Sequence, residues 1–279
     1  MKSMNIRHVL IKNSFEHLQK GVASLLLIIF FMASGCKGQE SEPEPELEET
    51  APNIVIKTSF EDSWGGFAPN YGGADIYSDP TAQDGDYSLR FTFPAGMESG
   101  IAPDIVYKTF PAEDELYIRF YFKLSANFQW HPITQKLIYF HCGQVDFEDT
   151  NHVLSVGHWD HAVSLVTQHN KGSDTDEQVF HWGNVSQITK NVWHKIVMRL
   201  VINKPGQHNG IAQVWLNDQL AIDRSDILWL IAADHGGWCD FTFTPVFGGG
   251  GPDVAQTMYL YFDNLIIQDG PFEPSGKNK

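Results

Sequence analysis

Residues Leu116–Leu124 (LYIRFYFKL) alternate between two kinds of side chain, and this pattern constrains the fold more than any other. Apolar Leu, Ile and Phe occupy every second position, whereas Tyr117, Arg119, Tyr121 and Lys123 occupy the positions between them. Because successive side chains of a strand point to opposite faces, the segment predicts a strand with one face in a core. The other face is either a ligand-binding sheet face or an ordinary solvated one.

Strand-like segments separated by turn residues continue along the chain, and no stretch of twelve residues shows a helical period. The predicted strands are Ile54–Ser59, Ser88–Phe93, Ile105–Phe110, Leu116–Leu124, Lys136–Phe140, Val163–Gln168, Val192–Ile202, Ala212–Leu216, Gln219–Ile222 and Met258–Gln268. Antiparallel strands in this number, without helices between them, predict an all-β fold, a two-sheet β-jelly-roll sandwich.

Residues 1–35 are typical of a bacterial lipoprotein signal peptide. A basic segment up to Lys20 precedes the apolar run Val22–Met32, which is short for a membrane span and is followed by Ala-Ser-Gly-Cys36. Small residues directly before a cysteine resemble the lipobox, which implies cleavage there, lipidation of Cys36 and attachment to a membrane. The alternative is an ordinary signal peptide with an incidental cysteine.

Residues 36–52 are predicted to form an acidic tether rich in Pro and Glu, too polar to fold. An acidic run after a lipidated cysteine also resembles the export signal of surface-displayed lipoproteins of Gram-negative bacteria. We therefore expect a protein anchored in the bacterial outer membrane and exposed at the cell surface; a plain solvated spacer is the alternative. Residues 53–273 are predicted to form a single jelly-roll domain, followed by a disordered tail at 274–279. We expect a monomer.

The charge of the chain argues against one class of partner. The sequence contains 34 acidic and 19 basic residues, a formal net charge of −15. Nucleic-acid binding rests on cationic contacts to phosphate, so no nucleic-acid partner is expected. The paired carboxylates that jelly-roll glycoside hydrolases carry on one strand, as Glu-x-Asp-x-(x)-Glu, are absent from the sequence.

Three segments stand out, in order along the chain: ANFQW followed by Gln135-Lys136-Leu137; Trp193-His194 followed by VINKPG and VWLN; and FTPVFGGG followed by Tyr261-Phe262-Asp263-Asn264. Together they resemble polysaccharide lyases with a jelly roll of the concanavalin A-like lectin/glucanase type, especially the alginate-lyase-like family 14. The resemblance implies a polysaccharide partner and β-elimination on a uronic-acid-containing glycan. The alternative is a non-catalytic glycan-binding protein, similar to a carbohydrate-binding module or a lectin, because fold does not fix function.

β-Elimination beside a uronic acid needs a group that neutralises the carboxylate, a base for the α-proton and an acid for the leaving oxygen. Lys136 matches a functional lysine in the Gly-Lys-Leu segment of the family. The other catalytic candidates are Arg119, Tyr121, His141 and His181.

Two features complicate this assignment. Tyr139 and His141 have the opposite parity from Lys136 in a regular strand, so a shared face requires a bulge. The Ser-x-Arg and Tyr-x-Tyr pairs of the family are not recognisable, and Gln135 stands where the family favours glycine.

Tyrosine, tryptophan and hydrogen-bonding side chains could line a glycan groove, since the apolar faces of sugar rings suit aromatic platforms. The candidate substrate-binding residues are Tyr117, Lys123, Trp130, Gln168, His169 and Trp182. Ordinary core or surface positions are the alternative for each.

A structural calcium site is predicted where the first and last strands meet, with Glu61, Asp263 and a carbonyl near Gly85 as oxygen ligands. Alternatively, these carboxylates accept backbone N–H groups. No other cofactor is expected. In an exported protein Cys142 and Cys239 could form a disulfide; two separate buried thiols are the alternative.

Overall fold

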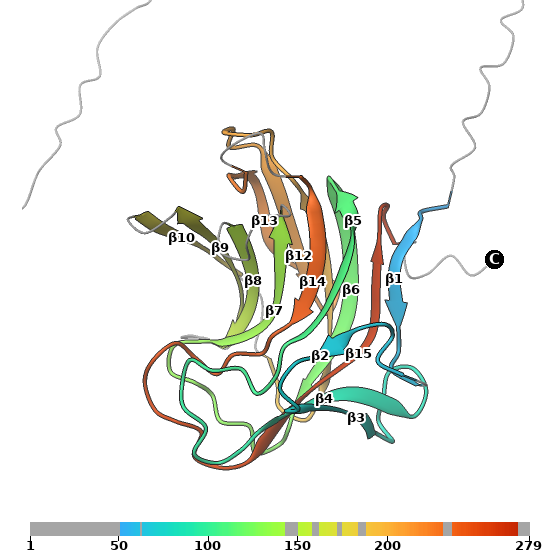
Figure 1. The fold of residues 1–279 in the computed structure, drawn as a ribbon, viewed down its shortest axis with the longest axis vertical. Helices are drawn as coiled ribbons and strands as arrows, with labels where there is room; N and C mark the ends of the chain where they lie inside the picture. Colours follow the sequence, from blue (N-terminus) through green and yellow to red (C-terminus); the bar gives the residue numbers. More distant parts are fainter. Residues whose placement is uncertain are drawn as a thin grey trace, which may run out of the picture. The chain divides into compact units, whose positions relative to one another are not determined.

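The protein is described here from a computed structural model, in which residues 51–61, 63–142, 150–157, 162–171, 175–183, 188–230 and 236–272 are placed. The regular elements of these residues are β-strands, arranged in two antiparallel sheets (Figure 1). No helix among the described residues is long and apolar enough to cross a membrane. The predicted all-β, two-sheet jelly-roll class is confirmed.

The first sheet, called the β6 sheet, has the strand order β13-β12-β11-β6-β15-β4-β3, and β1 also pairs with β15. Its strands are β1 (Ile54–Thr58), β3 (Ala74–Ser78), β4 (Tyr87–Phe93), β6 (Glu115–Leu124), β11 (Trp193–Val201), β12 (Gly210–Leu216), β13 (Gln219–Ile227) and β15 (Met258–Gln268).

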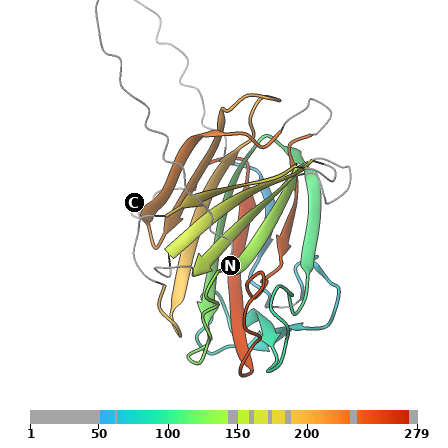
Figure 2. The same cartoon turned by 90° about the vertical axis from the view of Figure 1, so that its left-hand side faces the viewer.

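The second sheet, called the β7 sheet, has the order β10-β9-β8-β7-β14-β5-β2. Its strands are β2 (Ala68–Pro69), β5 (Val106–Glu113), β7 (Gln135–Cys142), β8 (Thr150–Gly157), β9 (Ala162–Lys171), β10 (Thr175–Trp182) and β14 (Trp238–Phe243). Strands β7 to β10 bend away from the rest in Figure 1, and Figure 2 is turned so that this part faces the viewer.

Aromatic side chains from both sheets form the core between them. The ring of Phe120 on β6 lies 6.5 Å from the rings of Phe241 and Phe243 on β14, centroid to centroid. Phe243 also lies 4.6 Å from Phe262 on β15. All four rings are fully buried, and burying one phenylalanine side chain contributes roughly 1.5–3 kcal/mol. The two sheets therefore pack face to face through these rings.

Strands β6 and β7 follow each other in sequence but belong to different sheets. The connection between them, residues 125–134, therefore crosses from one sheet to the other. Ile118, Phe120 and Phe122 point into the core, so the alternate residues of β6 point away from the β7 sheet. We call these outward residues the β6 row: Tyr117, Arg119, Tyr121 and Lys123.

Candidate active site

A β-bulge on β7 determines which side chains of this strand face outward. Lys136 lies opposite Ser155 of β8, and Ile138 lies opposite the next β8 residue, Leu154, so Leu137 is an extra residue on β7. Leu137 and Ile138 are both fully buried. An extra residue reverses the alternation of the strand beyond it. Lys136 therefore shares the outer face with Tyr139 and His141, which meets the condition set by the sequence.

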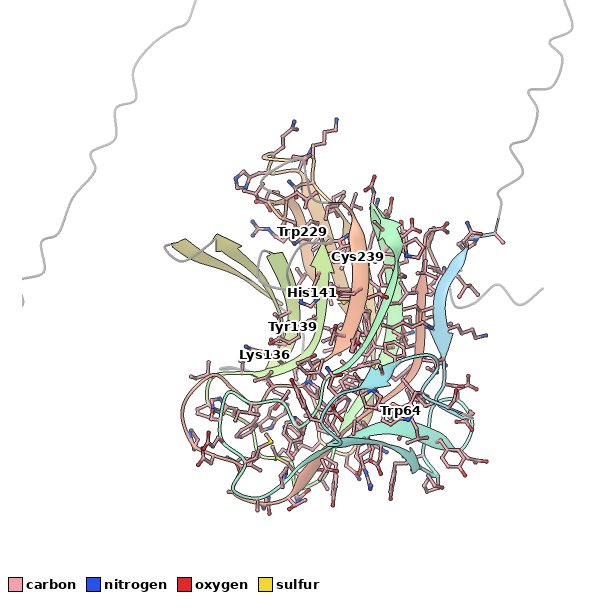
Figure 3. The ribbon with its side chains drawn as sticks, viewed as in Figure 1. Trp64, Lys136, Tyr139, His141, Trp229 and Cys239 are labelled. Carbon is pink, nitrogen blue, oxygen red and sulfur yellow. The ribbon has the colours of Figure 1, made fainter. Side chains whose placement is uncertain are left out.

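Lys136, Tyr139 and His141, called the β7 row, follow one another along the strand (Figure 3). The Lys136 Nζ atom lies 5.9 Å from the centroid of the Tyr139 ring. The Tyr139 ring is nearly parallel to the His141 ring, at an interplanar angle of 17° and a centroid distance of 6.4 Å. Three groups that can transfer a proton are thus adjacent on one sheet face.

The imidazole of His141 is held by a buried carboxylate. Its Nδ1 atom lies 2.7 Å from Oδ1 of Asp240 on β14, and the same oxygen accepts the His141 backbone N–H at 3.0 Å. The side chains of His141 and Asp240 are only 13% and 7% exposed. Of the two neutral tautomers of the ring, donation from Nδ1–H to the carboxylate selects the one in which Nε2 is the proton-accepting nitrogen.

Tyr139 and His141 of the β7 row line a hollow of about 510 Å³ on the outer face of the β7 sheet, and Lys136 lies next to it, beside the Tyr139 ring. Thr242 of β14 lies on its floor, opposite Tyr139 of β7 and Tyr107 of β5. The Thr242 Oγ1 atom is buried and has no hydrogen-bond partner among the described residues. A buried hydroxyl without a partner costs free energy, and a ligand or water in the hollow could satisfy it. The hollow is lined by Asn70, Ile105, Tyr107, Tyr139, His141, Thr242 and Thr244.

Burial shifts the pKa values of two groups of the β7 row in opposite directions. Desolvation lowers the pKa of the Lys136 ammonium, because burial disfavours its charged form. Desolvation raises the pKa of the Tyr139 phenol for the same reason. Lys136 is thus closer to being a neutral base, while Tyr139 keeps its proton and can act as an acid.

Sequence reasoning missed Asp240 and Thr242. Both lie on β14, a strand that was not predicted, in the pattern Asp240-Phe241-Thr242-Phe243. The two phenylalanines are fully buried, so the two polar residues face the opposite side. That alternation was the signal that could have identified the strand and its outward residues.

The β6 row does not join this site. Even-numbered residues of β6 and Phe140 of β7 meet in the core, so the outward rows of the two strands lie on opposite outer faces of the sandwich. Arg119 and Tyr121, named as catalytic candidates with Lys136, therefore lie on the other outer face of the sandwich. The physical reason is the connection at residues 125–134, which changes sheets instead of forming a hairpin.

The members of the β6 row have contacts of their own. The Lys123 Nζ atom lies 2.6 Å from Oδ2 of Asp79. The Arg119 guanidinium lies 5.1 Å from the Phe272 ring, and the Tyr117 ring lies 5.8 Å from the Arg199 guanidinium.

The four candidates on β9 and β10 are Gln168, His169, His181 and Trp182. The structure describes the backbone of these residues but not their side chains. The register aligns His141 with Asn151 and Gln168, and Lys136 with Ser155, Ser164 and Trp182.

His181 instead aligns with Leu165, Leu154 and Ile138, a row whose members on β7 and β8 are buried in the core. His169 pairs with Thr150 and Glu177. The roles predicted for these four residues stay predictions.

Trp130 lies in the connection between β6 and β7. It is half-buried, packs against the core and contacts the Phe128 ring edge-on at 6.2 Å. These contacts match the core alternative for this tryptophan.

The predicted calcium ligands are engaged by backbone N–H groups. Asp263 accepts the backbone N–H groups of Gln83 at 2.6 Å and Asn264 at 2.6 Å, and Glu61 accepts those of Asp86 and Tyr87. Burial also raises the pKa of the Asp263 carboxyl to about 6, against these hydrogen bonds, which lower it.

Calcium requires several oxygen ligands, and no group of three or more His, Cys, Asp or Glu side chains suited to a metal occurs among the described residues. The hydrogen bonds that Glu61 and Asp263 accept match the alternative of carboxylates bonded to the backbone, and the calcium site stays a prediction.

The two remaining predictions concern cysteines: a disulfide between Cys142 and Cys239, and lipidation of Cys36. Trp238 of β14 pairs with Cys142 of β7, which brings the backbones of Cys142 and Cys239 near each other. The Cys142 side chain is outside the described residues, so the disulfide stays a prediction. Cys36 also lies outside them.

Comparison with known families agrees with the resemblance seen in the sequence. Residues 58–243, two thirds of the chain, match the model of a family described as polysaccharide lyase. The chain belongs to this family. Among curated protein sequences, none matches the chain.

Solved structures with this fold include several lyases. A mutant of alginate lyase Aly36B in complex with an alginate trisaccharide has a TM-score of 0.55 and 16% identity, covering 79% of this chain and 100% of that one. The endo-β-1,4-glucuronan lyase of the fungus Trichoderma reesei has a TM-score of 0.59 and 10% identity, covering 79% and 96%. The PL-14 alginate lyase of Aplysia kurodai has a TM-score of 0.55 and 14% identity, covering 72% and 89%. At these identities the likeness shows the fold.

Proposed function

We propose that this member of the polysaccharide lyase family cleaves a uronic-acid-containing polysaccharide by β-elimination in the hollow on the outer face of the β7 sheet. One observation carries the proposal: the bulge at Leu137 brings Lys136, Tyr139 and His141 onto one face beside the hollow. Family membership and the fold shared with alginate and glucuronan lyases support it.

In the proposed reaction Lys136 is the base. Its neutral Nζ takes the proton from the carbon next to the uronate carboxylate, and the C–H electron pair forms a new C=C bond. The bond from the neighbouring carbon to the glycosidic oxygen breaks. Tyr139 donates its phenolic proton to that oxygen. The lowered pKa of Lys136 and the raised pKa of Tyr139 place each proton where this step needs it.

The uronate carboxylate must be neutralised for the α-proton to become removable. Asn70 lies at the exposed edge of the hollow, and the unpartnered Thr242 hydroxyl lies on its floor. Both can donate hydrogen bonds to a carboxylate. Asp240 fixes the ring of His141, which orients Nε2 for a hydrogen bond with the substrate.

The test is a screen of alginate, glucuronan and other uronate polymers for the ultraviolet absorbance of an unsaturated product. We expect absorbance to grow with one of them, and Lys136→Ala to abolish it. Lys204→Ala, which changes an exposed lysine in a loop of the β6 sheet, is the matched control. If the wild-type chain binds these polymers but produces no unsaturated product, the non-catalytic glycan-binding alternative holds and the lyase proposal fails.

We also propose that the domain is displayed on the outer membrane through a lipid on Cys36. The supporting feature is the sequence Ala-Ser-Gly-Cys36 after an apolar run and before an acidic tether. The full chain, expressed in a Gram-negative host with labelled fatty acid, should carry the label and be degraded by protease added to whole cells. Cys36→Ala should lose the label; a chain that remains labelled would contradict the proposal.

A further inference from the structure

A second hollow, of about 660 Å³, lies between β3 and β4 of the β6 sheet and the connections that precede β3 and follow β4. Asp75 of β3 and Arg90 and Thr92 of β4 lie among its lining residues, and Tyr71, which is 70% exposed, lies at its rim. The catalytic proposal uses none of these residues. Arg90 and Thr92 alternate with the fully buried Phe91 and so point away from the core.

An ion pair in this hollow presents polar groups in a fixed orientation. The Arg90 Nε and Nη2 atoms donate to the two carboxylate oxygens of Asp75, at 2.9 and 2.6 Å. The guanidinium lies 4.0 Å from the Tyr77 ring and 5.2 Å from the Tyr259 ring, which belong to the two strands on either side of β4. Asp75 remains 47% exposed. A bidentate pair of this kind leaves carboxylate lone pairs and guanidinium N–H groups for neighbouring sugar hydroxyls.

The planar groups continue across the sheet as one layer. Tyr261 lies 5.8 Å from Tyr77, and the Lys123 Nζ atom lies 4.7 Å from the Tyr261 ring and 4.6 Å from the Trp193 ring. Five strands thus contribute to the aromatic layer, which consists of Tyr77, Arg90, Tyr259, Tyr261, Lys123 and Trp193. Aromatic rings offer flat apolar surfaces that match the faces of sugar rings.

Both cations of the layer are balanced by carboxylates. Arg90 pairs with Asp75, and Lys123 pairs with Asp79, whose side chain is 4% exposed. The chain as a whole is strongly acidic, with a net charge of −15. Within the described part of this layer a polyanion would therefore meet only cations already paired with carboxylates, whereas an uncharged sugar would meet fixed hydrogen-bonding groups and aromatic rings.

We propose that this hollow and the adjoining aromatic layer form a second carbohydrate-binding site, which takes uncharged pyranose units of a polysaccharide. The aromatic layer and the outward residues Arg90 and Thr92 lie on the opposite outer face from Lys136. It therefore holds a glycan independently of cleavage, which allows the domain to bind a neutral polymer while the β7 sheet acts on a uronate polymer.

The experiment is affinity electrophoresis of the full domain in gels that contain soluble neutral glycans (hydroxyethyl cellulose, laminarin or galactomannan) or alginate. We expect at least one neutral glycan to retard the wild-type protein. Tyr71→Ala should weaken that retention roughly threefold to tenfold, the loss of one aromatic contact. Thr92→Lys, which places a long side chain into the hollow, should weaken it further. Tyr87→Ala, a change of an exposed tyrosine at the start of the same strand as Arg90 and Thr92, is the matched control.

Two outcomes would overturn the proposal: no retardation of the wild-type protein by any neutral glycan, or the same retention in wild type, Tyr71→Ala and Thr92→Lys. Retention by alginate alone would also overturn it, because the charge argument would then be wrong. Lys136→Ala separates this proposal from the catalytic one. It should lose formation of the unsaturated product and keep its retention on the neutral glycan, whereas Tyr71→Ala should show the reverse.

Discussion

The outer faces of the two sheets carry similar residues in different electrostatic settings. On the β6 sheet, Lys123 forms an ion pair with Asp79 and contacts two aromatic rings. On the β7 sheet, Lys136 is also near an aromatic ring, but none of the described carboxylates pairs with it. Desolvation alone lowers its pKa. The comparison teaches that a lysine beside tyrosines is structural or reactive according to its partner, because a carboxylate holds the ammonium form and burial without one disfavours it.

The largest expected effect is on catalysis. Lys136→Ala should lower the rate of unsaturated-product formation by about 10²–10⁴-fold, the usual contribution of a general base. Lys123→Ala should leave kcat on a soluble oligosaccharide within about threefold of wild type, since Lys123 lies on the other face. The measurement is steady-state kinetics at fixed pH on protein shown to be folded. Equal losses in both variants would remove the distinction between the faces.

The next effect is on stability, where replacing Lys123 should cost more than replacing Lys136. Lys123→Met should lower the free energy of unfolding by about 3 kcal/mol, because it leaves the buried Asp79 without its ammonium. Lys136→Met should change it by less than about 1 kcal/mol or raise it, since it removes an unpaired buried amine. Urea denaturation of both variants gives the comparison.

The ion pair between Asp79 and Lys123 also predicts how the free energy of unfolding changes with pH. Burial raises the pKa of Asp79, but hydrogen bonds from Lys123 and Thr81 outweigh it and hold the pKa below the usual 3.8. The stability from this carboxylate is thus present above the unfolded pKa and is lost as the pH falls through the lower folded value. The difference in stability between wild type and Lys123→Met should therefore shrink in strong acid. A difference that does not change with pH would argue against the ion pair.

The pH dependence of the rate sharpens the role of the β7 row. Because the pKa of Lys136 is lowered, the rate should rise with pH and reach its plateau below the ordinary lysine value of 10.5. Because the pKa of Tyr139 is raised above its ordinary value of 10.0, loss of its proton should not lower the rate within that range. A pH profile of kcat/KM tests both, with Tyr139→Phe removing the proton donor. A rate that falls as the pH rises from about 8 to about 10 would contradict the roles assigned to Lys136 and Tyr139.

The smallest effects come from the two residues of β14. Asp240→Asn should keep the fold but lower kcat about tenfold, because the amide no longer selects the Nδ1–H tautomer of His141. Thr242→Val should be neutral in stability or stabilising by about 1 kcal/mol, since it removes a buried hydroxyl without a described partner. The same variant should raise KM if this hydroxyl contacts the substrate. Thr244→Val, at the edge of the same hollow, is its control.

Several elements of the fold were predictable because they depend on residues near each other in the chain. Every predicted strand overlaps a strand of the structure, and the apolar positions of Leu116–Leu124 are the core face of β6. Strands β2, β3, β8, β10 and β14 were missed. The strand β14 is the most instructive of these, because it is short and central and its alternation of Asp, Phe, Thr and Phe was present in the sequence.

For the site, the sequence by itself determined the chemistry available on β7: Lys136, through the family resemblance, and His141, through its residue type. It also determined that one face of each strand must be buried, since alternation is a property of a single strand. Only the tertiary structure decided that β6 and β7 join different sheets, because sheet membership depends on pairing between distant segments. It likewise decided that Leu137 is the extra residue and that Asp240, 99 positions from His141, holds its ring. Bulges and cross-strand partners are set by register, and no local pattern of side chains encodes register between strands so far apart.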